Sequence, residues 1–285
     1  MKTKRSGRLV DMTRYLLENP HTLVPLTYFA ERYNAAKSSI SEDLTIVKSV
    51  FEEQGTGKLN TTAGAAGGVM FVPSVSPGEA KATIAELVDR IADPARLLPG
   101  GYLYLTDILG HPRTVNEIGR LFAAVFADRK IDVVMTVATK GIPLAYAVAD
   151  HMNVPVVIVR RDSKVTEGST VSINYVSGST GRIQTMVLAK RSLKNGSRVL
   201  IIDDFMKAGG TINGMVNLLQ EFEAEVAGIG VLVEAEDVVE RLVDEYISLV
   251  QLAGVDVKQQ KINAEEGNYF RFLESAIQEG KGDEV

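Results

Sequence analysis

Residues 199–211 read VLIIDDFMKAGGT, and this stretch decides the fold of the larger part of the chain. Four apolar residues run into Asp203 and Asp204, a short loop with two glycines follows, and Thr211 opens a periodic apolar segment that ends at Phe222. A parallel strand that is buried on both faces has such a continuous apolar run, and ligands bind outside its carboxyl end. The stretch therefore predicts a strand, a ligand-binding loop and a helix.

The loop between this strand and this helix has the features of a phosphate site. Backbone N–H groups at the start of a helix bind anions, and glycine has no Cβ to keep the backbone away from a ligand. We therefore expect the phosphate to be held by Ala208, Gly209, Gly210 and Thr211.

The two acids need a different partner, because carboxylates next to a phosphate site repel the phosphate. The vicinal hydroxyls of a ribose could donate to Asp203 and Asp204 while its 5-phosphate lies in the loop, and an Mg²⁺ ion could screen the repulsion. The alternative is an acidic helix cap followed by a glycine turn. The combination of apolar strand, GGT loop and amphipathic helix favours the ribose phosphate.

The same stretch resembles the phosphoribosyl pyrophosphate (PRPP) motif of type I phosphoribosyltransferases, in which the acids hold the ribose and the loop holds the 5-phosphate. The chain departs from these enzymes just before the glycine pair, where they usually have small or hydroxyl residues and it has Phe205, Met206, Lys207 and Ala208. Lys207 adds a cation and bulk, which suits binding a polyphosphate more than converting it. We count Phe205 and Lys207 among the expected ligand contacts and assign no catalytic residue.

The segments around this motif predict an α/β domain with a central parallel sheet. Buried strands are expected at 132–138, 154–160 and 226–234, with a helix at 143–152, and strand-helix-strand repetition gives parallel strands. Residues 168–188 instead alternate in polarity and are rich in Thr, which predicts a long hairpin that projects from the sheet. This hairpin resembles the mobile flap of the transferases.

The remaining segments of this domain give weaker signals. Tyr102–Leu105 is expected to form a short edge strand. Beyond Asp237 we expect a helix, two strands and a C-terminal helix around 270–277.

A second ligand loop is expected at the same edge of the sheet. Ala138, Thr139, Lys140 and Gly141 follow the buried strand at 132–138, and a tight loop with exposed N–H groups and a lysine suits a diphosphate. The loop resembles the pyrophosphate loop of the transferases. An ordinary strand-to-helix turn with a solvated lysine is the alternative.

Four further side chains are candidates for ligand contacts. Arg160, Arg161 and Lys164 lie where the hairpin leaves the third strand and could neutralise a phosphate-rich ligand, although a charged rim is the alternative. Tyr102 lies in the region where the transferases place a hood over the ligand and could cap the site. A role in hydrophobic packing is the alternative for this tyrosine.

The first 74 residues predict a different domain. Helical spacing of apolar residues indicates helices at 6–18, 25–33 and 38–51, and the segments 58–62 and 69–72 then predict a β-hairpin. We expect Ser38 or Ser39 to cap the third helix, with Glu42 as the reciprocal partner of Ser39. Three helices and a hairpin predict a winged helix-turn-helix domain.

In a winged helix the third helix enters the major groove of DNA. The residues expected near bases and phosphates are Lys37, Ser38, Ser39 and Ser41, and the basic N-terminal arm adds Lys4, Arg5 and Arg8. The alternative is a helical interaction or dimerisation unit that does not touch DNA. The acids Glu42 and Asp43 on the expected reading helix weigh against DNA binding.

Charge and composition agree with this division of the chain. Residues 1–74 hold 9 Lys and Arg against 7 Asp and Glu, whereas the whole chain of 285 residues has a net charge of −5, so the basic excess lies at the N-terminal end. The chain has no cysteine, its three histidines are far apart, and no apolar run approaches the ~18 residues of a membrane helix, so we expect no structural metal, no membrane association and a cytoplasmic, nucleoid-associated location.

A proline-bearing linker at 73–78 separates the two expected domains, a winged-helix domain at 1–74 and a transferase-like domain at 75–285. Over nearly its full length the chain resembles the bacterial purine operon repressor family, in motifs that include RSGRLVD, SSISEDL, GGYLYLTDILG and KVTEGSTVSINYVSG. The resemblance implies a homodimer that binds operator DNA of purine-synthesis genes and is released by PRPP. It needs no other cofactor, and the alarmone ppGpp is a candidate competitor. The alternative is a catalytic purine phosphoribosyltransferase with an N-terminal extension.

Overall fold

The structure is a computed structural model, and it describes residues 3–64, 67–162, 168–176, 181–236, 238 and 240–273. The chain divides into two compact units. Met1–Pro77 form most of the first unit, and the second consists of Gly78–Asp150 and Val154–Val285.

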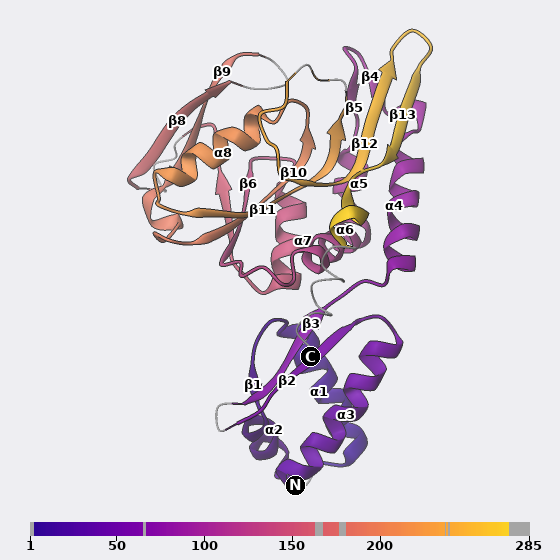
Figure 1. Cartoon of the computed structure of the whole chain (residues 1–285), viewed down its shortest axis with the longest axis vertical. Coiled ribbons are helices and arrows are strands. Elements are labelled where there is room, and N and C mark those ends of the chain that lie inside the picture. Colours follow the sequence, from indigo (N-terminus) through magenta and orange to yellow (C-terminus); the bar gives the residue numbers. More distant parts are fainter. Residues whose placement is uncertain are drawn as a thin grey trace. The chain divides into compact units, whose positions relative to one another are not determined.

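The first unit is a winged helix, as the sequence predicts (Figure 1). Three helices are followed by a hairpin, and a very short strand joins the hairpin to make a sheet of order β1-β3-β2. The elements are α1 (Arg5–Glu18), β1 (Val24–Pro25), α2 (Leu26–Tyr33), α3 (Lys37–Glu53), β2 (Gly57–Thr62) and β3 (Gly68–Pro73). One apolar core joins them, because each helix turns an apolar stripe inward: Met12 and Leu16 from α1, Phe29 from α2, and Ile40 and Leu44 from α3.

The predicted cap of the third helix is wrong. Helix α3 begins at Lys37 with Ala36 at its N-cap position, and no side chain caps it. Asn34 takes the left-handed conformation with φ 47° and ends α2, and Ala36, which is extended, directly precedes α3. Ser38 and Ser39 therefore lie inside the first turn.

The second unit contains a six-stranded sheet of order β13-β12-β11-β10-β6-β7. All neighbouring strands are parallel except the last pair, β12 and β13. This confirms the predicted central parallel sheet. The strands are β6 (Val133–Val137), β7 (Val156–Val159), β10 (Arg198–Met206), β11 (Glu225–Ala235), β12 (Ile247–Asp256) and β13 (Lys261–Glu266).

Helices cover both faces of this sheet. On one face, α8 (Gly210–Gln220) shares an apolar core with the sheet and with the hairpin of β8 (Thr170–Val176) and β9 (Ile183–Ala189). On the other face, α6 (Pro112–Val125) packs so closely on β11 that a Cβ at Gly230 would lie 2.8 Å from the ring of Phe122. Further helices are α4 (Pro77–Ile91), α5 (Thr106–Leu109) and α7 (Ile142–Met152).

Two sequence predictions fail at the rim of this sheet. Tyr102–Leu103 (β5) pairs with Leu97–Leu98 (β4) in a separate two-stranded sheet, so it is not an edge strand of the central sheet. The described residues between β11 and β12, 238 and 240–246, form no helix. At the C-terminal end, residues 269–273 are helical, and the rest of the predicted helix lies outside the described residues.

The contact between α6 and α7 generates a stability prediction. A Cβ at Gly119 would lie 2.6 Å from the Cβ of Ala147 and 2.7 Å from its backbone carbon, so these helices must separate to admit it. We expect Gly119→Ala to lower the free energy of unfolding by about 1–3 kcal/mol, because overpacking shifts the backbone. Urea unfolding measures this. In Gly78→Ala, the control, the new Cβ meets no atom within 4 Å, and equal stability of the two variants would contradict the prediction.

Candidate functional site

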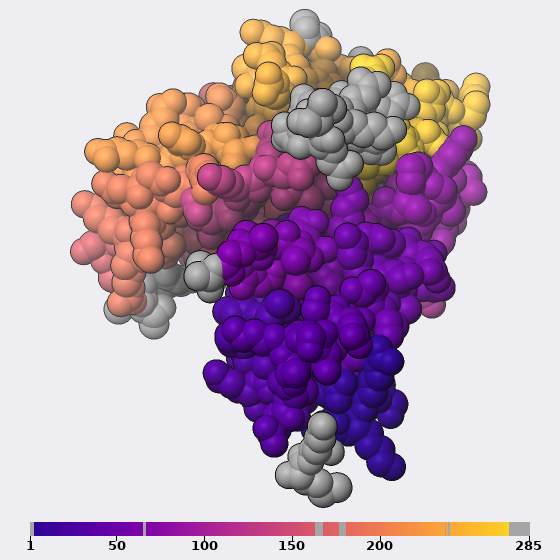
Figure 2. All heavy atoms as spheres, turned by 60° about the horizontal axis from the view of Figure 1, so that its bottom comes forward, coloured from indigo at the N-terminus to yellow at the C-terminus, as the bar shows by residue number. Residues whose placement is uncertain are grey.

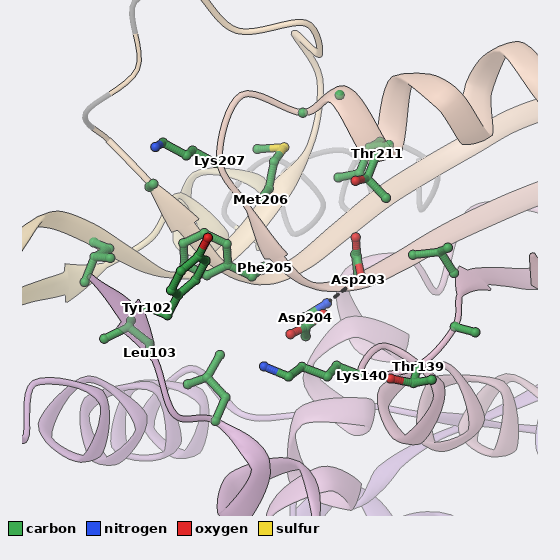
Figure 3. Close-up of a pocket in the computed structure, with 18 of the residues that line it drawn as sticks. Tyr102, Leu103, Thr139, Lys140, Asp203, Asp204, Phe205, Met206, Lys207 and Thr211 are labelled. Carbon is green, nitrogen blue, oxygen red and sulfur yellow. Dashed lines mark hydrogen bonds between the residues drawn. The ribbon is translucent and has the colours of Figure 1, made fainter. Parts of the chain in front are cut away.

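A cavity of about 890 Å³ opens at the carboxyl ends of β6, β7 and β10 (Figure 3). It brings together predicted ligand residues from four separate parts of the chain. Of the predicted residues that the structure describes, Ala208 and Gly141 do not line it, and those that do are Tyr102, Ala138, Thr139, Lys140, Arg160, Arg161, Asp203, Asp204, Phe205, Lys207, Gly209, Gly210 and Thr211.

The two acids lie at the end of β10. Asp203 is only 4% exposed, and its Oδ1 accepts a hydrogen bond of 3.0 Å from the backbone N–H of Asp204. Figure 3 shows the side chain of Asp203 directed toward Thr211 and that of Asp204 directed toward Lys140. The acids therefore face the two predicted ligand loops, one each.

Burial raises the pKa of Asp203 well above its usual value, and the neighbouring charge of Asp204 raises it further. Burial also raises the pKa of Asp204, while the positive charge of Lys140 opposes this shift. Both shifts mean that the ionised pair is unfavourable in the free protein. A ligand that donates hydroxyl groups to the pair or brings a cation to it would stabilise the charged form.

The loop before α8 is built to expose backbone N–H groups. Gly209 is the N-cap of α8 in the left-handed conformation, with φ 82°, and the N–H of Asn213 makes the first helical bond to its carbonyl at 2.8 Å. The N–H groups of Gly210, Thr211 and Ile212 consequently have no partner within the helix. Together with the positive end of the helix dipole, these N–H groups are suited to binding an anion.

Gly141 allows the second loop to pass beside the acids. A Cβ at this position would lie 2.2 Å from Oγ1 of Thr136 and 3.2 Å from Oδ1 of Asp203, so a larger residue would collide with the site. The peptide bond between Ala138 and Thr139 in this loop is cis. Thr139 and Lys140 are exposed toward the cavity.

The remaining candidates differ in how they are held. The backbone of Arg160 pairs with Val187 of β9, with N–O distances of 3.0 and 2.7 Å, so this residue joins the sheet to the hairpin. Tyr102 is 59% exposed at the cavity mouth, and Lys207 is exposed as well. Lys164 lies outside the described residues.

Sequence reasoning missed part of the cavity wall. Gly100 and Gly101, both with positive φ, line the cavity beside Tyr102, and consecutive glycines after a proline were a signal for such a turn. Gly254 and Val255 of β12 also line it, and no local signal marks them.

The described residues contain no group of three or more His, Cys, Asp or Glu that could hold a metal ion. Magnesium in phosphate sites is commonly bound by one or two carboxylates together with the phosphates of the ligand. Asp203 and Asp204 fit an Mg²⁺ ion that arrives with its ligand in this way.

In the N-terminal unit, a buried acid organises the basic arm. Asp43 of α3 is 1% exposed, and its two carboxylate oxygens pair with the guanidinium groups of Arg5 and Arg8 at 2.8 Å each. Arg8 is itself buried, whereas the side chain of Arg5 is 54% exposed. Asp43 thus ties α1 to α3 and does not face outward as the sequence suggested.

The other predicted DNA residues lie at the surface of this unit, whose indigo and violet spheres face the viewer in Figure 2. Exposed residues are Lys4, Lys37, Ser38 and Ser41, and Ser39 is half-buried. Arg8 is buried, and its guanidinium group pairs with Asp43. The DNA contacts of all these residues stay predictions.

Comparison with known proteins decides the family. Residues 4–73 match the N-terminal domain of the bacterial purine repressor, and residues 105–261 match the phosphoribosyl transferase domain. The chain is 67% identical to the purine biosynthesis transcriptional repressor PurR of Bacillus subtilis, with 97% of each chain covered. The chain belongs to the bacterial purine repressor family. This confirms the resemblance drawn from the motifs.

Other similar proteins include a second transcriptional regulator and two phosphoribosyltransferases. The purine biosynthesis transcriptional activator PurR of Lactococcus lactis is 46% identical, with 94% of this chain and 98% of the relative covered. A xanthine phosphoribosyltransferase of Lactococcus lactis is 31% identical over 60% of this chain and 89% of its own. Adenine phosphoribosyltransferase from Thermoanaerobacter pseudethanolicus shares the fold, with a TM-score of 0.51, 23% identity, and 58% of this chain and 98% of its own covered.

The full-length relatives carry regulatory names, and the enzymes match only part of the chain. The phosphoribosyltransferase domain is therefore part of a transcriptional regulator rather than of an enzyme, as the motif departure at Phe205–Ala208 predicts. Among the described residues, none of the helices is long and apolar enough to cross a membrane.

The raised pKa of Asp203 generates a prediction about stability. Because the folded protein holds this proton more tightly than the unfolded chain, stability falls as the pH rises from about 4 through the folded-state pKa. We expect Asp203→Asn, which keeps the acceptor for the Asp204 N–H, to stabilise the free protein by about 1 kcal/mol or more at pH 7.5.

Thermal unfolding of both proteins between pH 5 and 8 measures this. The gain should shrink as the pH is lowered, because the wild-type carboxyl then takes up its proton. Asp128→Asn, at an exposed position, is the control and should change little. A destabilised Asp203→Asn at pH 7.5 would contradict the prediction.

The Asp43 contacts generate a second prediction. Asp43→Ala leaves the buried guanidinium of Arg8 without its carboxylate, and breaking such a pair lowers the free energy of unfolding by about 3 kcal/mol or more. Glu42→Ala, at the exposed neighbouring acid, should have little effect. Urea unfolding of the two variants compares them, and equal stabilities would exclude the structural role of Asp43.

Proposed function

We propose that the chain is a repressor of purine biosynthesis genes that binds operator DNA through its winged helix and is released when PRPP binds in the transferase-like cavity. The 67% identity to a relative named a repressor supports repression, and the Lactococcus relatives named activators mark the competing outcome. Direct measurement of purine-gene transcription with and without the protein separates the two.

The observation that carries the effector assignment is the convergence of a buried acid, a half-buried acid and the two predicted anion-binding loops on one cavity. Asp203 and Asp204 accept hydrogen bonds from the two ribose hydroxyls of PRPP. The free N–H groups at the start of α8 bind its 5-phosphate, and the Thr139–Gly141 loop with Lys140 binds its diphosphate. Mg²⁺ carried by the diphosphate would be shared with the two acids.

The nucleotide ppGpp is a second ligand of the same site in this proposal. It also combines a ribose with diphosphate groups, and a cavity of about 890 Å³ is within the size range of nucleotide-sized ligand sites. Its binding would oppose that of PRPP, because both need the acids and the phosphate loops. Calorimetric titration of PRPP into protein saturated with ppGpp tests this, and unchanged PRPP affinity would remove ppGpp from the proposal.

A homodimer is also part of the proposal. Winged-helix and helix-turn-helix proteins commonly read two half-sites with two copies of the domain. Sedimentation of the free protein and of its complex with operator DNA measures the stoichiometry, and a monomer in both would overturn this part.

We expect Asp203→Ala and Asp204→Ala to keep DNA binding and lose the response to PRPP, since linkage requires PRPP and DNA to weaken each other through the site that PRPP occupies. A gel shift on purine-gene promoter DNA with increasing PRPP measures this, and Asp128→Ala is the control. Release of either variant at the wild-type PRPP concentration would disprove the ribose assignment.

The same samples address the enzymatic alternative. An assay of PRPP consumption with purine bases runs beside the gel shift. Turnover of PRPP by a protein that does not bind promoter DNA would favour a phosphoribosyltransferase, whereas release from DNA without turnover supports the repressor.

A further inference from the structure

The phosphate loop rests on a segment that lies outside the ligand cavity. The N–H of Leu242 donates to the carbonyl of Ala208 at 2.9 Å, and a Cβ at Gly209 would lie 2.9 Å from Cγ2 of Val243. Leu242 and Val243 thus form the outer wall of the loop, and Val243 is itself buried in the core beneath α8. The position of the loop N–H groups therefore depends on what holds this segment.

Arg241, the residue before this wall, ties it to the end of β11. Its Nη2 donates to the carbonyl of Ala235 at 2.8 Å, and its Nη1 lies 2.9 Å from Oε2 of Glu234. Its guanidinium also lies 5.2 Å from the centre of the Tyr246 ring. Arg241 does not line the ligand cavity, so these contacts serve the segment and not a ligand.

The carboxylate of Glu234 is buried and has a partner for each of its two oxygens. It is 5% exposed, its Oε1 accepts from the hydroxyl of Ser248 at 2.6 Å, and its Oε2 accepts from the hydroxyl of Tyr246 at 2.5 Å. Asn268 extends the network, because its side chain bonds both the N–H of Ser248 and the carbonyl of Tyr246. Two hydrogen bonds and the ion pair with Arg241 hold this carboxylate in one position.

The register between β10 and β11 places Glu234 near the loop before α8. Glu234 pairs with Met206, the last residue of β10, so the network lies beside the strand end from which the phosphate loop starts. A buried negative charge at this position would repel a phosphate in the neighbouring loop unless a cation compensated it. Arg241 supplies the compensating positive charge and also connects the Leu242–Val243 segment to the end of β11.

We infer that Glu234, Arg241 and Tyr246 are positioning residues for the 5-phosphate subsite: they hold the Leu242–Val243 wall, which in turn presents the N–H groups at the start of α8. This inference rests on the proposed function, because it concerns the same ligand site. It goes beyond that function because it states that residues outside the ligand cavity contribute to the affinity of the site for its ligand. Fixing a loop in its bound conformation raises affinity by reducing the entropy lost on binding.

The test separates the two phosphate subsites by titration calorimetry. Ribose 5-phosphate probes the acids with the α8 loop, and Mg²⁺-pyrophosphate probes the Thr139–Gly141 loop. We expect Arg241→Ala to weaken ribose 5-phosphate by about tenfold or more, with pyrophosphate affinity within a factor of about two of wild type. Lys140→Ala should show the reverse pattern.

Two further variants keep the test decisive. Tyr246→Phe removes only the hydroxyl that donates to Glu234, so it provides a milder change of the same kind if Arg241→Ala fails to fold. Arg198→Ala is the matched control, because Arg198 pairs with Asp132 at the opposite, amino end of β10 and should leave both affinities unchanged.

The outcomes distinguish this inference from the proposed function. The positioning role would be overturned if Arg241→Ala and Tyr246→Phe bound ribose 5-phosphate with unchanged affinity, or if both probes were weakened equally. The proposed function would still stand in that case, provided that the wild-type protein binds PRPP. Wild-type protein that binds neither PRPP nor ribose 5-phosphate would overturn the proposed function itself, and the positioning role with it.

Discussion

The candidate ligand site depends on two adjacent carboxylates at the end of β10, of which Asp203 is buried and Asp204 is half-buried. The strand carries Asp203 from a fully buried apolar run to the rim of the sheet, where burial still raises its pKa and that of Asp204. Lys140, whose charge acts against this shift, comes from the loop after β6, the neighbouring strand in the sheet. Because β10 and β6 pair in parallel, the acids, Lys140 and both predicted anion-binding loops meet at one edge of the sheet.

Local sequence predicts the parts of this arrangement that local interactions determine. The continuous apolar run, the glycine pair and the periodic segment after Thr211 were enough to predict the strand, the loop and α8, and the end of the strand at 132–138 gave the position of the second loop. The wall of Leu242 and Val243 could not be found in this way, because it follows the loop by more than thirty residues and meets it only through the order of β10, β11 and β12. The prediction of a helix after Asp237 failed for the same reason, because Leu242 and Val243 make tertiary contacts with the loop before α8 and such contacts override local helix propensity.

The winged-helix unit shows a related limit of reading charge along a sequence. Asp43 counted against DNA binding when it was considered as a charge on the reading helix, and Arg8 counted in favour. The structure pairs the two in the interior, so neither contributes to the exposed surface as the sequence suggested. Periodicity predicted three helices correctly because burial of apolar side chains follows the helical repeat, whereas the burial of a polar group depends on finding a partner on another element.

The site has the properties that a sensor needs even without those of a catalyst. Catalysis requires interactions that strengthen in the transition state, whereas an effector needs only to bind one conformational state of the protein better than another. Burial raises the pKa of both carboxyls, and in the proposed function a ribose that donates to both acids would stabilise their charged form, so that much of the ligand's effect would fall on the protein itself. Between the acids and the glycines, Met206 is buried in the core and Lys207 is exposed at the cavity, which fixes the loop to the sheet while adding a cation for a polyphosphate. In the proposed function, ligand binding would therefore change the stability of this edge of the sheet, which is the kind of change that a regulator transmits.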